Sequence, residues 1–93
     1  MTVEARQIVV HGRVQGVGFR FFVRETGMRL GLTGNVCNRE EGRVEIIVEG
    51  RPDHIAEFIR EVEKGPPASR VVRIDVRVVP PTGSCTSFLI EGW

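Results

Sequence analysis

Hydrophobic and polar residues alternate along three segments of the chain, a pattern typical of strands with one covered face. In residues 6–12, Ile8 and Val10 share one face while Gln7 and His11 lie on the other, and residues 43–50 repeat this pattern. In residues 70–79 the apolar positions are Val72, Ile74, Val76 and Val78. Two further strands are expected from Leu32 to about Asn38 and near Ser87 to Glu91, with the sequence REEGR forming a tight hairpin between the second and third strands.

Two helices fit between these strands. The first is expected from about Phe19 to Leu30, because apolar side chains recur there at helical spacing and Gly31 supplies a stop. The second begins near Pro52 and ends at Lys64. Its apolar face, spaced i, i+3, i+4 and i+7, consists of Ile55, Phe58, Ile59 and Val62.

The resulting order is β-α-β-β-α-β with a short extra strand at the C-terminus, in one domain over residues 1–93. We therefore predict an α+β fold of the ferredoxin-like, split βαβ type. Its sheet should be antiparallel with both helices on one face, because right-handed crossovers place them there. One-sided alternation in the strands agrees with this, since only one face of the sheet would be covered.

Composition narrows the class of protein. The chain is 41% hydrophobic and 27% charged, which fits a globular domain rather than a disordered or membrane-spanning one. Its net charge of +1 gives no overall field that would favour nucleic acid or a membrane. The first residues lack the apolar run of a signal peptide, so we expect a cytoplasmic protein, and we expect a monomer. Two cysteines without a histidine cluster are too few for a zinc site, and we expect no metal or other cofactor.

The segment GRVQGVGFR, residues 12–20, has the chemistry of a phosphate-binding loop. Its glycines, Gly12, Gly16 and Gly18, can adopt positive φ, which lets backbone N–H groups turn toward an anion. The segment leads directly into a helix N-terminus, whose unpaired amides and dipole favour phosphate. Arg20 adds a guanidinium that matches two phosphate oxygens. A merely flexible turn is the alternative interpretation.

Other catalytic patterns fit less well. The loop has no Lys-Ser or Lys-Thr, and its glycines miss the dinucleotide spacing. Cys37 and Arg43 have the C-x5-R spacing of cysteine phosphatases, but two glutamates lie between them and a strand follows, which disfavours a reactive thiolate. His54 is expected on the surface, and His11 has no carboxylate nearby in the sequence to orient it as a general base.

The sequence VHGRVQGVGFR resembles the first signature of the acylphosphatases, small enzymes that hydrolyse the carboxyl phosphate bond of acyl phosphates to carboxylate and phosphate. GNVCNREEGRVEIIVEG, residues 34–50, is similar to that family's second motif, with Asn38 at the position of its catalytic asparagine. The resemblance implies that Asn38 orients the attacking water and that Arg20 binds the substrate phosphate. It also implies phosphate binding by loop amides at Gln15, Gly16, Val17, Gly18 and Phe19.

Two positions depart from the family pattern. Asn35 stands where an aromatic residue is usual, and Cys37 where a long basic one is common. Both resemble the acylphosphatase-like domains at the start of hydrogenase-maturation carbamoyltransferases, so the alternative is a module that binds phosphate or carbamoyl phosphate without hydrolysing it. Those domains belong to far longer chains, which favours the enzyme here. An RNA-binding domain would need exposed aromatics on its central strands, and these strands have almost none. Whether Cys37 and Cys85 are bonded stays open at this point.

Overall fold

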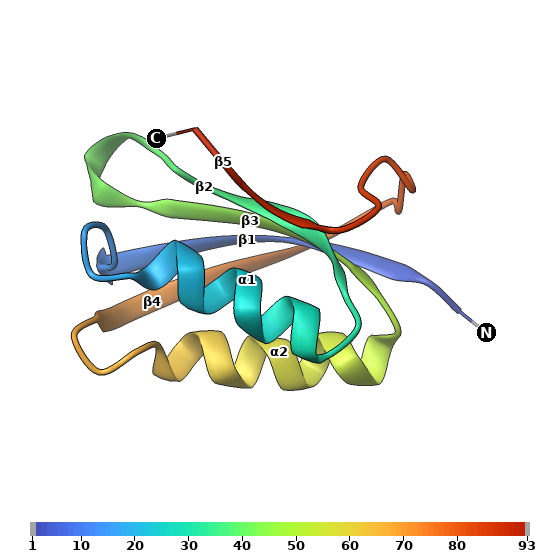
Figure 1. Cartoon of the computed structure of the whole chain (residues 1–93), viewed down its shortest axis with the longest axis horizontal. Coiled ribbons are helices and arrows are strands. Elements are labelled where there is room, and N and C mark those ends of the chain that lie inside the picture. Colours follow the sequence, from blue (N-terminus) through green and yellow to red (C-terminus); the bar gives the residue numbers. More distant parts are fainter. Residues whose placement is uncertain (1, 93) are drawn as a thin grey trace.

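A five-stranded sheet carries two helices on one face in the computed structural model, which describes residues 2–92 (Figure 1). The strand order across the sheet is β4-β1-β3-β2-β5. This confirms the predicted split βαβ arrangement with its extra C-terminal strand. In chain order the elements are β1 (Glu4–Arg13), α1 (Phe19–Arg29), β2 (Thr33–Asn38), β3 (Val44–Gly50), α2 (Pro52–Lys64), β4 (Arg70–Val79) and β5 (Phe88–Glu91).

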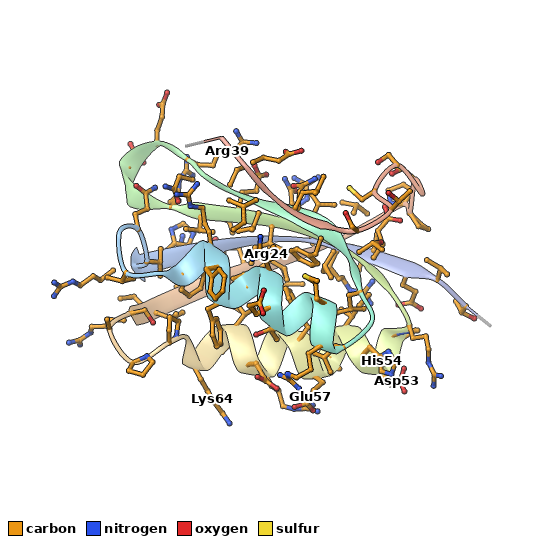
Figure 2. The ribbon with its side chains drawn as sticks, in the orientation of Figure 1. Arg24, Arg39, Asp53, His54, Glu57 and Lys64 are labelled. Atoms are coloured by element: carbon orange, nitrogen blue, oxygen red, sulfur yellow. The ribbon has the colours of Figure 1, made fainter. Side chains whose placement is uncertain are left out.

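The hydrophobic core lies between the sheet and the two helices. The inward residues of β1 and β3 are completely buried, as the alternation in the sequence predicted: Ile8, Val10, Val44, Ile46 and Val48. Phe19 and Val23 of α1 and Phe58 of α2 pack against them. Because full burial of such a side chain stabilises a fold by roughly 1.5 to 3 kcal/mol, this layer fixes the positions of both helices. On the opposite side of α2, Glu57 and Lys64 project away from the sheet (Figure 2).

The sheet is mixed rather than purely antiparallel, which corrects one prediction. Strands β1, β2, β3 and β4 pair antiparallel, whereas β5 runs parallel to β2 and pairs Gly34 with Phe88. The cause is the connection after β4, which crosses from one edge of the sheet to the other before the chain turns back. A strand that returns in this way has the direction of β2, so the last strand closes the second edge in parallel.

The apolar face of β4 also differs from the prediction. The pairing with β1 shifts between His11 and Gly12, so Val72 becomes an extra residue and Val71 packs against the core in its place. Gly12 makes this bulge possible, because a Cβ there would lie 2.1 Å from the carbonyl oxygen of Arg70. Gly12 therefore belongs to β1 and not to the loop. Val72 is 70% exposed and Val78 is 77% exposed.

The connection between β2 and β3 lies at the same end of the sheet as the β1–α1 loop (Figure 1). It includes a single 3-10 turn, Glu40–Gly42, in which Glu41 has a positive φ of 63°. The backbone N–H of Arg39 donates to the carbonyl of Arg43 and closes the turn at 2.8 Å. This is the expected hairpin. Among residues 2–92, no helix is long and apolar enough to cross a membrane.

Candidate active site

The loop from Val14 to Gly18 joins β1 to α1 and presents its backbone amides unpaired. Gly16 and Gly18 have φ angles of 73° and 75°, and a Cβ at either position would meet no neighbouring atom. Within residues 2–92, the backbone N–H groups of residues 15–20 donate no hydrogen bond to another protein group. Gly18 is the N-cap of α1 and offers no side-chain cap. These amides therefore remain available to an anion at the positive end of the helix.

Arg20 lies in the first turn of α1 beside this loop. Its side chain is partly buried and lines a small pocket of about 180 Å³ together with Gly16, Gly18 and Ile90. Most arginines in residues 2–92 have a carboxylate partner, but Arg20 is in no ion pair there. Arg13, Lys64, Arg70 and Arg77 also lack a carboxylate partner there but are exposed, and Arg43 donates to the carbonyl of Glu40 at 3.2 Å. Arg20 is thus a sheltered, uncompensated cation.

Asn38 ends β2 on the side of the sheet that faces the helices, opposite the buried Val44. Its Oδ1 is buried and has no hydrogen-bond partner among the described residues. A buried amide oxygen without a partner is costly, by about 1 to 3 kcal/mol, unless a water or ligand supplies a donor. Asn38 also lines a larger open pocket of about 620 Å³, which it shares with Gln15 and the turn at residues 39–43.

Gln15 joins the loop to the turn that follows Asn38. Its side-chain Nε2 donates to the carbonyl of Arg39 at 2.9 Å and to that of Arg43 at 2.8 Å. The same carboxamide therefore holds both ends of the β2–β3 turn against the β1–α1 loop. From the sequence we expect only a backbone role for Gln15, because a contact to residues so far along the chain leaves no local signal.

The arginine that follows Asn38 is paired with a carboxylate of the neighbouring strand. Arg39 lies on the side of the sheet away from the helices (Figure 2). Its Nε donates to a carboxylate oxygen of Glu45 at 2.5 Å. Burial alone would raise the pKa of Glu45, but the hydrogen bonds from Arg39 and from Gln7 outweigh it and lower that pKa. Arg39 is therefore neutralised by an ionised partner.

The structure divides the predicted site residues between the two pockets. Gly16, Gly18, Phe19 and Arg20 line the smaller pocket, and Gln15 and Asn38 line the larger one. Val17 lines neither and packs against the core, where the ring of Phe19 also lies. Ile90 of β5 lines the smaller pocket and was not predicted, because its place depends on the parallel pairing of the last strand.

The structure also shows the surroundings of two residues that the sequence disfavoured as catalytic groups, Cys37 and His11. Cys37 and Cys85 are free thiols, and Cys37 is buried. Burial raises the pKa of Cys37, while the positive charges of Arg39 and, more weakly, Arg20 oppose that rise. A thiol of raised pKa is a poor nucleophile. His11 has no carboxylate near it in the sequence, but pairing of β1 with β4 brings Asp75 within 2.9 Å of its Nε2.

Comparison with known proteins agrees with the resemblance in the sequence. A sequence model of the acylphosphatases matches residues 6–90. An acylphosphatase from Koribacter versatilis is 46% identical over 91 residues, which cover 98% of this chain and 83% of that relative. The crystal structure of acylphosphatase from Bacillus subtilis aligns with a TM-score of 0.92 and 38% identity over 98% of this chain and 100% of that one.

A longer protein contains a similar domain. Full-length HypF, crystallised in a phosphate- and nucleotide-bound form, aligns with a TM-score of 0.89 and 41% identity over 98% of this chain but 12% of its own length. The family match therefore spans nearly all of the described fold. The relatives named above and a further one from Bacillus pumilus are called acylphosphatases and do not carry the name of the longer protein. This chain belongs to the acylphosphatase family.

Proposed function

We propose that this protein is an acylphosphatase that hydrolyses R–CO–OPO₃ with water to give a carboxylate and inorganic phosphate, and that Arg20 and Asn38 carry the reaction. The observation that supports these roles is the pairing of an uncompensated, sheltered cation at Arg20 with unpaired backbone amides at residues 15–20. Together they form a receptor for a doubly charged phosphate group.

Phosphate would be held by the amides of Gln15, Gly16, Val17, Gly18 and Phe19 and by the guanidinium of Arg20. A planar guanidinium can donate to two phosphate oxygens at once, and the amides add donors in fixed positions. These groups also stabilise the charge that spreads over the phosphoryl oxygens in the transition state. Positioning and charge neutralisation are the main contributions that a protein can make to phosphoryl transfer.

Asn38 would hold the attacking water. Its buried Oδ1 lacks a partner and would accept a hydrogen bond from that water. The water attacks phosphorus, the bond between phosphorus and the acyl oxygen breaks, and the carboxylate leaves with the bonding electron pair. The proton of the water passes to a phosphate oxygen of the substrate. No protein nucleophile is needed, because a carboxylate is a good leaving group.

We also propose that one copy of the chain is sufficient for catalysis, as a single domain acting on a small substrate in the cytoplasm without a nucleic-acid partner. All of the proposed groups come from one chain. Because no titrating side chain takes part, the rate should vary little with pH near neutrality, and it should not change when a chelator removes divalent metals. A pH-dependent limb abolished by His11→Gln would contradict the proposed mechanism.

The test is the initial rate of benzoyl phosphate hydrolysis, corrected for spontaneous hydrolysis. We expect Arg20→Ala to lower kcat/KM by about 10³-fold or more, and Asn38→Ala to lower kcat by about 10²-fold with little change in phosphate inhibition. Arg13→Ala, an exposed arginine next to the loop, and Asn35→Ala, on the opposite face of β2, are matched controls that should keep their activity. Wild type that binds phosphate without turnover would favour the non-catalytic module instead.

A further inference from the structure

Within residues 2–92, strand β4 forms an open edge of the sheet, since β1 is the only strand that pairs with it. It is ten residues long and contains no proline, so it lacks one of the devices that block pairing with a further strand. Its valines on the face toward the helices are poorly covered: Val76 is 42% exposed and Val78 is 77% exposed. Nearby, Val3, Pro80 and Pro81 line an open groove of about 480 Å³.

Charged residues occupy the opposite face of the same segment. Asp75 and Arg77 are both exposed there, two residues apart. The hydrogen bond from His11 lowers the pKa of Asp75, so this carboxylate is ionised at neutral pH. Arg77 takes part in no ion pair within residues 2–92. One edge strand therefore carries both halves of a charge pair and an uncovered apolar strip.

We propose that β4 is a self-complementary docking surface that pairs antiparallel with β4 of a second copy of this chain, about a two-fold axis at Val76. In a two-fold antiparallel pair, directly opposite residues lie on the same face of the joined sheet. With the axis at Val76, Asp75 lies opposite Arg77 of the partner subunit, and Arg77 lies opposite the partner's Asp75. On the other face Val76 meets its own copy, and Val78 meets the partner's Ile74.

The neighbouring registers are less favourable. An axis at Asp75 would set this carboxylate against its own copy and Arg73 against the partner's Arg77, three like-charge contacts in all. An axis at Ile74 would also form two opposite-charge pairs, between Arg73 and the partner's Asp75, but these two residues already pair within each chain at 3.3 Å. It would also place Val78 opposite the partner's Arg70 and would run through the bulge at Val72, where the alternation of faces breaks. Among these registers, the one at Val76 alone gives Arg77 a carboxylate partner and keeps the contacts between apolar residues away from the bulge.

The association should be weak. A single strand pair over residues 73–79 buries less than the roughly 1,000 Å² expected of a stable interface, so the dimer should form reversibly at high protein concentration. Arg20, Asn38 and Gln15 lie outside the paired segment. Dimerisation should therefore leave acylphosphatase activity unchanged, and the proposal stands independently of that activity.

Sedimentation equilibrium at protein concentrations up to about 1 mM tests the charge pairs. The average mass of wild type should rise toward that of a dimer. Arg77→Asp and Asp75→Arg should each raise the dissociation constant by about tenfold or more, because each variant opposes like charges in its own dimer. An equimolar mixture of the two should regain the wild-type constant, since the mixed dimer restores two opposite-charge pairs. Arg70→Asp, outside the paired segment, should change little.

Oxidative cross-linking tests the register even where a charge variant fails to fold. In a background lacking Cys37 and Cys85, Val76→Cys should form a disulfide dimer rapidly, because identical residues on the axis lie within bonding distance. Val78→Cys is more exposed but faces the partner's Ile74, so it should react at least tenfold more slowly. A wild type that stays monomeric at about 1 mM, a mixture that shows no recovery, or equal cross-linking at both positions would overturn the proposal.

Discussion

At the scale of single residues, the carboxamide of Gln15 is the contact that links the proposed phosphate site to the end of β2. It donates to carbonyls on both sides of the turn that follows Asn38. We expect Gln15→Ala to lower kcat by about 10-fold to 10²-fold, because a small displacement of the water relative to the phosphate is enough to slow the reaction. The inhibition constant of inorganic phosphate should change far less, since Arg20 and the loop amides are retained.

A double-mutant cycle separates this positioning role from general destabilisation. If Gln15 acts through Asn38, then Gln15→Ala should have little further effect on kcat in the Asn38→Ala background. Gln15→Glu keeps the length of the side chain but loses both amide hydrogens, so it should be as slow as the alanine variant. Additive effects on kcat, or a rescue by glutamate, would contradict the role proposed for Gln15.

The two thiols should differ in reactivity. Burial raises the pKa of Cys37, so at a given pH less of it is thiolate, while Cys85 is partly exposed. We expect one fast and one slow phase when the native protein is titrated with a thiol reagent near pH 8, with the slow phase becoming fast in denaturant. In Cys85→Ser the fast phase should disappear. Its persistence would mean that Cys37 is accessible and that the packing around β2 is looser than described.

At the scale of elements, the packing of α1 on β5 depends on Gly27. In a solvent-exposed helix, Gly→Ala stabilises by about 1 kcal/mol. Here a Cβ at Gly27 would lie 2.4 Å from the ring of Phe88, which is buried and packs on Phe58. We therefore expect the opposite sign, with Gly27→Ala lowering the free energy of unfolding by about 1 to 3 kcal/mol in urea titrations. Adding Phe88→Leu should recover part of the loss, and an unchanged or raised stability of the single variant would contradict this packing.

Elements with a strong local pattern were predictable from the sequence, and contacts between distant segments were not. Helix α2 begins at Pro52 and ends at Lys64 as predicted, because its caps and apolar spacing are local signals. The bulge in β4 depends on the approach of Gly12 from β1, and the parallel direction of β5 depends on a crossing over the whole sheet. Neither feature produces a recognisable pattern in the sequence of the residues involved.

The candidate site divides in the same way. The glycines and Arg20 form a continuous segment, so an anion-binding loop could be inferred from the residue types alone. The role of Asn38 rested on the family resemblance, because a polar residue at the end of a strand is ordinary by itself. The contact of Gln15 with the turn joins residues more than twenty positions apart, so it could not be predicted from the sequence and is seen only in the folded chain.

At the scale of the whole molecule, a buried carboxylate fastens the connection that carries the chain from one edge of the sheet to the other. Glu49 of β3 is 6% exposed. It accepts hydrogen bonds from the backbone N–H groups of Thr82 and Gly83, at 3.0 and 3.1 Å, and from the hydroxyl of Thr82. The connection leads directly to β5, whose Ile90 lines the pocket of Arg20. Glu49 therefore links the stability of the far edge to that of the proposed site.

This carboxylate should make stability depend on pH. The backbone hydrogen bond from Thr82 is the main influence that lowers the pKa of Glu49 below its usual value. A group whose folded pKa is lowered contributes its full stability above the unfolded value of about 4.3 and loses it as the pH falls through the folded pKa. Glu49→Gln should therefore be less stable than wild type by about 1 to 3 kcal/mol at pH 7, with the difference shrinking toward pH 3 in urea titrations.

The matched control is Glu63→Gln, which changes an exposed glutamate on α2 and should follow wild type. A constant difference between Glu49→Gln and wild type across this range would mean that Glu49 stabilises the connection by shape rather than by charge.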